Sequence, residues 1–193
     1  MRPITTSRAY DESISVNKVL KSTYLLLSFT LLFSASMAYV AIITNAPPMG
    51  IILLLIGMFG LYFLTTSLKN SAWGLLAIFA YTGFMGYTLG PILNMYIHGF
   101  SNGSQIIMTA LGATGVIFFG LSSYVLVSKK DFSYMGGFLA VAMMTAFLAG
   151  IASIFFQMPM LNLLISGAFA LISSGFILYT TSQVINGGER NYI

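Results

Sequence analysis

Few residues in this sequence could act as catalytic groups or metal ligands. The chain has no Cys and one His, His98, which excludes thiolate nucleophiles, disulfides and any metal site with several His ligands. The acidic residues, all outside the long apolar runs, are Asp11, Glu12, Asp131 and Glu189. The Ser hydroxyls in the apolar runs therefore lack a general base, and no carboxylate pair is available for hydrolysis. We expect no catalytic residue, no metal site and no cofactor, and interpret His98 as a polar residue at a helix end.

Among the polar residues of the apolar runs, Asn94 is the one whose hydrogen-bonding groups are hardest to satisfy within its own helix. A Ser or Thr hydroxyl usually donates to a preceding carbonyl of the same helix, whereas the Asn amide has two donors to satisfy. Asn94 follows shortly after Gly90 and Pro91. Two roles stay open: Asn94 tethers one helix to another, or it lines a cavity.

The composition is that of a membrane protein. Of the 193 residues, 58% are hydrophobic and 6% are charged, whereas a soluble domain carries about 25% charged residues. The eight Lys and Arg are too sparse for a nucleic-acid surface. We therefore predict one all-α polytopic membrane domain.

Apolar runs long enough to cross a bilayer recur along the chain. They cover approximately residues 24–43, 50–66, 72–97, 106–127, 135–156 and 161–181. Together they predict a transmembrane bundle over residues 22–183. Residues 1–21 form a polar N-terminal segment, and residues 184–193 form a polar C-terminal segment.

The third run is longer than a bilayer requires and contains Gly86, Gly90 and Pro91. Because proline lacks an amide donor, Pro91 predicts a kink or break, and the freed backbone groups should face protein or a wet cavity. Small residues four positions apart predict close helix packing. These sets are Gly86 and Gly90; Ala142, Ala146 and Gly150; and Ser166, Ala170 and Ser174.

Several segments resemble one known family. They are Gly83–Asn94, Asn17–Ser28, Lys129–Gly137 and Ile172–Ile193. The stretch from Gly83 to Asn94 is similar to the third-helix motif of the Bax inhibitor family, also called the transmembrane Bax inhibitor motif family. The other segments resemble its bacterial YccA-like branch.

The resemblance implies a fold of seven helices, six of them around a central one. It also implies one of two activities: modulation of the AAA membrane protease FtsH, or a pH-sensitive leak of cations such as calcium under the control of acids on the sixth and seventh helices. Thr180 stands at the position matching the sixth-helix acid, and the seventh helix would begin after Ile193. We therefore expect the native chain to continue with one more helix. A Thr hydroxyl does not titrate near neutral pH, which disfavours the leak.

The sequence thus favours a non-enzymatic protein of the bacterial inner membrane. Its expected partners are membrane lipid and an FtsH-type protease with its associated membrane proteins, and nucleic acid is not among them. A calcium leak channel is the alternative, and calcium is a partner only in that case.

Basic residues predict the orientation of the chain. They are Arg2, Arg8, Lys18, Lys21, Lys69, Lys129, Lys130 and Arg190. All lie before the first run or after the second, fourth and sixth runs, and cytoplasmic loops collect Lys and Arg. The N-terminus and the loop that contains Lys129, Lys130 and Asp131 are therefore predicted to be cytoplasmic.

A reporter that is active only outside the cytoplasm should be inactive when fused after Lys129, because the positive charges retain this loop inside. The same reporter fused after Asn102, in a segment without basic residues, should be active. Activity from the fusion at Lys129 would overturn this topology.

Overall fold

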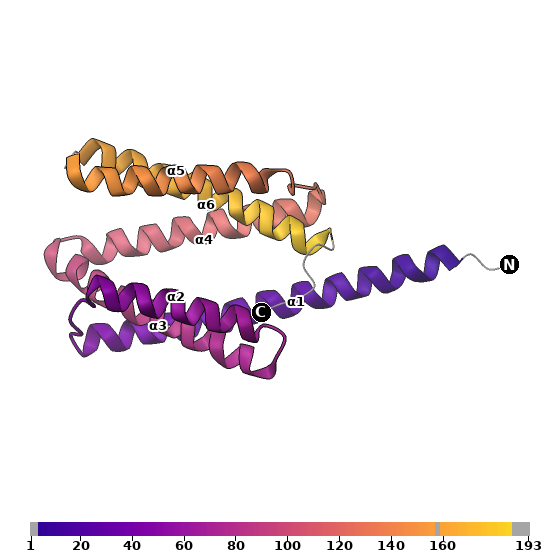
Figure 1. The fold of residues 1–193 in the computed structure, drawn as a ribbon, viewed down its shortest axis with the longest axis horizontal. Helices are drawn as coiled ribbons and strands as arrows, with labels where there is room; N and C mark the ends of the chain where they lie inside the picture. Colours follow the sequence, from indigo (N-terminus) through magenta and orange to yellow (C-terminus); the bar gives the residue numbers. More distant parts are fainter. Residues whose placement is uncertain (1–3, 157–158, 187–193) are drawn as a thin grey trace. The chain divides into compact units, whose positions relative to one another are not determined.

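The computed structural model describes residues 4–156 and 159–186 (Figure 1). This part of the chain is helical and contains no strand. Its helices are α1 (Ile4–Ile43), α2 (Ile51–Leu68), α3 (Ala72–Gly99), α4 (Gly103–Ser128), α5 (Met135–Phe156) and α6 (Pro159–Ile185). Six of these described segments are long and apolar enough to span a membrane. The predicted all-α membrane fold is confirmed.

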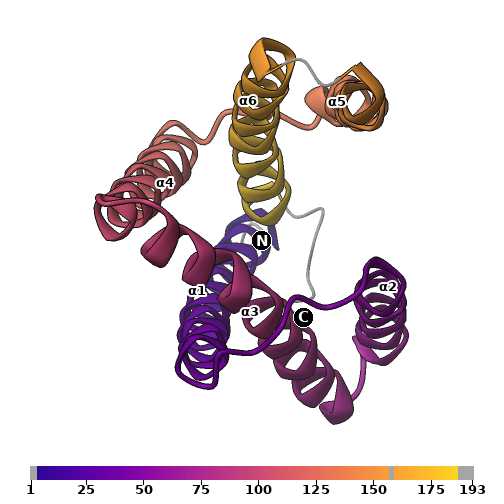
Figure 2. The ribbon, with the colours of Figure 1, turned by 90° about the vertical axis from the view of Figure 1, so that its left-hand side faces the viewer.

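The helices fall into two units. The first contains α1, α2, α3 and the start of α4 as far as Leu111, and the second begins at Gly112 with the remainder of α4 and continues through α5 and α6. In the first unit, α3 contacts both α1 and α2, and Figure 2 shows α3 between them. In the second unit, α5 and α6 contact each other (Figure 1).

Helix α1 begins well before the predicted first span. It is continuous from Ile4, and residues Lys21–Ile43 are the portion apolar enough to cross a bilayer. A helix that is already formed gains one hydrogen bond for each residue it adds, so it extends into a polar segment without a new nucleation cost. At its other end Asn45 takes a left-handed conformation with φ 47°, and Pro47 and Pro48 follow.

Glycines of α3 permit its close approach to α1. A Cβ atom on Gly86 would overlap the carbonyl oxygen of Ser34, and one on Gly90 would overlap the side chain of Ala41. Both glycines and Ala41 are buried. In a bilayer, where apolar burial provides little drive for association, this backbone proximity stabilises helix pairs through van der Waals contact. Gly86 and Gly90 thus lie in the kind of helix contact that their spacing predicts.

The predicted break at Pro91 is not observed. Helix α3 is continuous from Ala72 to Gly99 with Pro91 inside it. A proline removes only its own amide donor, so one carbonyl on the preceding turn loses its helical partner while the neighbouring hydrogen bonds persist. Pro91 is buried, and it lines a pocket together with residues of the turn that follows α1. We attribute the continuity of α3 to this packing, since prolines are tolerated in membrane helices where neighbouring elements support the backbone.

The α2–α3 and α5–α6 pairs use glycine in the same way. Gly57 of α2 lies against the ring of Phe84, and Gly175 of α6 lies against Leu139 of α5. By contrast, a Cβ on Gly150 would meet nothing within 4 Å. Periodic spacing of small residues therefore does not by itself identify the face of α5 that packs.

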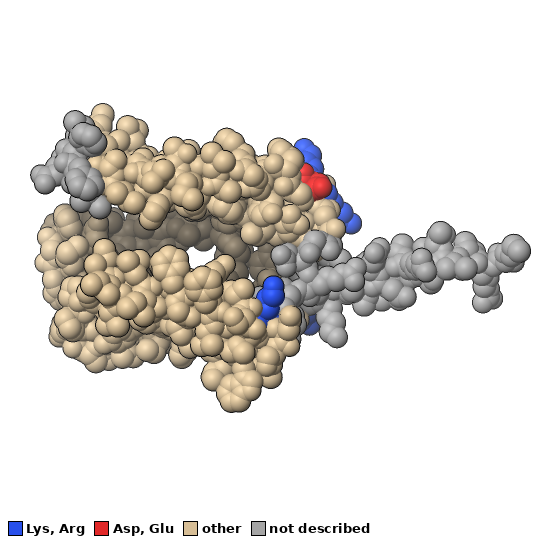
Figure 3. All heavy atoms as spheres, in the orientation of Figure 1, with Lys and Arg blue, Asp and Glu red and all other residues tan. Residues whose placement is uncertain are grey.

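The outward faces are apolar. Large side chains such as Val127, Leu163 and Leu171 are at least 71% exposed, and on the face shown in Figure 3 the charged side chains lie at helix ends and not along the helices. Such surfaces are unfavourable in water and suited to contact with lipid.

Substitution of Gly90 by Ala should lower the free energy of unfolding by about 1 to 3 kcal/mol, because the added methyl group overpacks the α1–α3 contact. Unfolding of the purified protein by denaturant in a fixed detergent measures the effect. Gly112→Ala in α4 is the matched control, since nothing lies within 4 Å of its Cβ position. Equal stability of the two variants would contradict the packing role of Gly90.

Candidate functional site

Asn94 joins the third helix to the turn that follows α1. Its Nδ2 donates to Asn45 Oδ1 at 3.2 Å. Asn94 Oδ1 is buried, and no hydrogen-bond partner is found for it in the described part of the protein. The first of the two roles left open by the sequence, a tether between elements, is therefore seen.

The second role, lining a cavity, is seen as well. A pocket of about 410 Å³ lies at this end of the first unit. It is lined by Asn45, Ala46, Pro47, Pro48, Pro91, Asn94, Met95 and His98. His98 is exposed in the last turn of α3, with Nδ1 3.0 Å from the backbone oxygen of Asn94. The pocket is thus lined by amide groups and proline rings. The hydrogen bond between Asn94 and Asn45 joins the turn after α1 to α3 at this place.

The charged loop between α4 and α5 has a defined conformation. Lys129 takes a left-handed conformation with φ 52° and donates its backbone N–H to Val125 at 2.8 Å, which caps the C-terminus of α4. Asp131 Oδ1 accepts a hydrogen bond from the backbone N–H of Ser133 at 2.8 Å. These bonds orient the chain between the two helices.

Ser182, at the end of α6, anchors this loop. Its side chain is fully buried, at 0% exposure. The hydroxyl oxygen accepts hydrogen bonds from the backbone N–H of Phe132 at 2.8 Å and from Asn186 Nδ2 at 3.0 Å. The hydroxyl itself lies 3.4 Å from two acceptors, the backbone oxygen of Lys130 and Asp131 Oδ1. One side chain therefore links the loop to a helix that begins almost thirty residues later in the sequence.

Sequence reasoning missed Ser182 as a site residue. It follows the last predicted span directly, and nothing in its type or spacing distinguishes it from the other Ser residues. Its partner Phe132 is 50 positions away and offers only a backbone amide. A backbone amide leaves no trace in the sequence, so no local signal could have identified the pair.

The hydrogen bonds around Asp131 change its acidity. Bonds from the Ser133 side chain and the Ser133 backbone, with a smaller one from Ser182, lower the pKa of the Asp131 carboxyl below its ordinary value of 3.8. Because the folded pKa is depressed, this contribution to stability is present above pH 3.8 and is lost as the pH falls through the folded value.

Thr180, at the position matching the family's sixth-helix acid, does not take part in this network. Its side chain is exposed, and its hydroxyl donates to the backbone oxygen of Phe176 at 2.7 Å within α6. The next two residues, Thr181 and Ser182, are buried. The side chain of Thr180 thus forms the local bond that is typical of a helical Thr.

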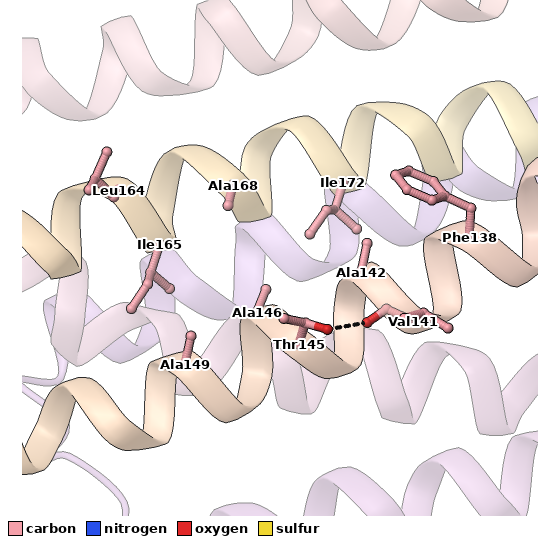
Figure 4. Close-up of a pocket in the computed structure, with 10 residues that line it drawn as sticks. All are labelled: Phe138, Val141, Ala142, Thr145, Ala146, Ala149, Leu164, Ile165, Ala168 and Ile172. Atoms are coloured by element: carbon pink, nitrogen blue, oxygen red, sulfur yellow. Dashed lines mark hydrogen bonds between the residues drawn. The ribbon is translucent and has the colours of Figure 1, made fainter.

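A groove between α5 and α6 is almost entirely apolar (Figure 4). Its volume is about 490 Å³, and its polar lining group, Thr145, donates to the backbone oxygen of Val141 at 2.9 Å. Ala142 and Ala146 of α5 and Ala168 of α6 line it. The groove suits an apolar side chain or a lipid chain and has no free donor in the part of it that Figure 4 shows.

Ser182→Ala should lower the free energy of unfolding by about 1 to 3 kcal/mol, because the buried amide of Phe132 loses its acceptor. Denaturant unfolding in detergent measures the difference. Ser174→Ala is the matched control on the same helix, since its hydroxyl bonds within α6, and should change stability by about 0.5 kcal/mol or less. Similar losses in both variants would rule out the anchoring role.

Comparison with known proteins identifies relatives over nearly the whole chain. The family model described as inhibitor of apoptosis-promoting Bax1 matches residues 16–193. An uncharacterised protein of Pseudomonas aeruginosa is 51% identical over 96% of this chain and 83% of its own length. The modulator of FtsH protease YccA of Escherichia coli is 46% identical over 100% of this chain and 87% of its own length.

An uncharacterised membrane protein of Vibrio cholerae is 40% identical over 98% of this chain and 85% of its own length. No solved structure matches the chain. The family match covers the apolar helices, the α3 glycines and the charged loop alike. The resemblance seen in the sequence is therefore confirmed, and this chain belongs to the Bax inhibitor family.

Proposed function

We propose that this protein is a non-enzymatic inner-membrane protein that binds an FtsH-type protease and modulates its activity. The observation that carries the proposal is the similarity of the whole chain to the Escherichia coli protein named as a modulator of FtsH protease. Identity of 46% over the full chain leaves no region of this protein without a counterpart in that relative.

The loop between α4 and α5 supports the same function. An AAA protease uses ATP, so its ATP-dependent part acts in the cytoplasm. The charge bias predicts that Lys129, Lys130 and Asp131 lie on that side of the membrane. A charged loop with a defined conformation is thus expected on the side of the membrane where the ATP-dependent part of the protease lies.

A calcium leak gated by acids has less support. Such a gate needs a group whose pKa lies near neutral pH. The predicted spans contain no Asp or Glu, and Thr180 is an exposed hydroxyl bonded within its own helix. Modulation of a protease requires no titrating group inside the membrane, so it agrees better with these residues.

Purification of the full tagged chain from native membranes should bring an FtsH-type protease with it. In proteoliposomes that hold the protease and a membrane substrate, added protein should change the rate of degradation. A polytopic membrane protein of similar size serves as the control. Absence of the protease together with unchanged degradation would contradict the proposal.

The same liposomes distinguish the alternative. Loaded with the protein alone, they should show negligible calcium flux between about pH 6 and 8, since no span carries an acidic gate. Thr180→Asp should restore flux only in part, because the family's second acid would still be missing. Robust flux with a midpoint near neutral pH, persisting in His98→Gln, would make the channel the better assignment.

A further inference from the structure

The α4–α5 loop carries a net positive charge, from Lys129 and Lys130 against Asp131. Lys129 and Lys130 are exposed, and neither forms an ion pair within the described residues. Lys130 Nζ lies 6.0 Å from the centre of the Tyr124 ring. The carboxylate of Asp131 is engaged with the amide of Ser133 and with Ser182. Asp131 keeps its negative charge, but its carboxylate is hydrogen-bonded within the loop and is not paired with either ammonium group among the described residues.

The loop is also held in position before any partner arrives. Ser182 holds the backbone of Phe132 and Lys130, and the Phe132 ring lies 6.3 Å from the ring of Tyr124. A preorganised loop loses little conformational entropy on binding, so more of the interaction energy contributes to affinity.

An aromatic residue completes the surface. Tyr134, at the end of the loop, is 79% exposed. Aromatic side chains that stand free beside charged groups are typical anchors of protein interfaces, where they bury a large area at small entropic cost.

We propose that residues 129–134, which we name the docking loop, bind an acidic segment of the protease partner. This inference rests on the proposed function and names the surface through which it acts. Ser182 holds the backbone that carries the two lysines, so the loop presents both charges to a folded acidic partner from one defined conformation. An anionic lipid surface attracts lysines through its surface potential, which requires no particular loop conformation. The locked conformation therefore favours a protein partner over an anionic lipid surface.

The first test removes the charge. The affinity of the purified full chain for the protease, both in nanodiscs of neutral lipid, is measured for the wild type and for Lys129→Gln/Lys130→Gln. We expect binding about three- to tenfold weaker, as for the loss of two exposed ion pairs, and a weaker dependence on salt. The matched control is Lys21→Gln/Lys69→Gln, which removes the same charge from other predicted cytoplasmic positions. Reporter fusions are used to check that each variant keeps the topology of the wild type.

The second test separates positioning from folding. Ser182→Ala leaves every charge in place but frees the loop, so it should also weaken binding. If Ser182 acts by positioning the two lysines, the same change in the Lys129→Gln/Lys130→Gln background should have little further effect. A general loss of fold would instead weaken both backgrounds equally.

The outcomes separate this inference from the function on which it rests. Wild-type protein that binds the protease while the loop variants bind as tightly would overturn the docking loop and leave the proposed function intact. Loss of binding to vesicles of anionic lipid, with protease binding retained, would reassign the loop to lipid and also overturn the inference. Failure of the wild type to bind the protease would overturn both.

Discussion

The hydrocarbon core of the bilayer provides no hydrogen-bonding partner for a backbone amide or carbonyl, and this constraint determines most of the structure. A chain that crosses it must satisfy its polar backbone internally, which for a single chain of this length favours continuous helices. Thr and Ser hydroxyls along the spans follow the same constraint. Thr65, Thr82 and Thr145 each donate to a carbonyl one turn earlier in their own helix.

The same constraint changes what holds the helices together. Leu and Phe are as well accommodated by lipid as by protein, so burial of large side chains does not select one packing arrangement. Close approach of two backbones does select one packing arrangement, and α3 shows which residues make that approach possible. Gly86 and Gly90 let α3 contact the carbonyl of Ser34 and the methyl of Ala41. Pro91 is buried next to Gly90 in the sequence and does not interrupt the helix.

Polar side chains then serve to join elements at the ends of the helices. Asn94 bonds to Asn45 beyond the end of α1, and Ser182 bonds to the loop before α5. Ser182 supplies a partner for a backbone amide outside the helices, where the regular pattern of helical hydrogen bonds has stopped. The bond from Asn94 joins two side chains instead. The residues that define the candidate interaction surface are therefore positioned by the same requirement that shaped the spans.

The sequence by itself determined the membrane class, the number of spanning helices and the family, because these depend on local hydropathy and on motifs read along the chain. It also indicated that Gly86 and Gly90 pack closely, since their spacing places them on one helical face. It could not decide between the two roles of Asn94, nor between a kink and a break at Pro91. Both depend on α1, which is distant in sequence.

Tertiary structure alone decided the role of Ser182 and the conformation of the loop from Lys129 to Tyr134. Ser182 acts on a backbone amide 50 positions earlier, and any residue type other than proline supplies such an amide. A hydroxyl in a membrane helix normally bonds within its own turn, so its sequence environment predicts the local bond. Only the folded contact between α6 and the loop makes the distant amide the better partner.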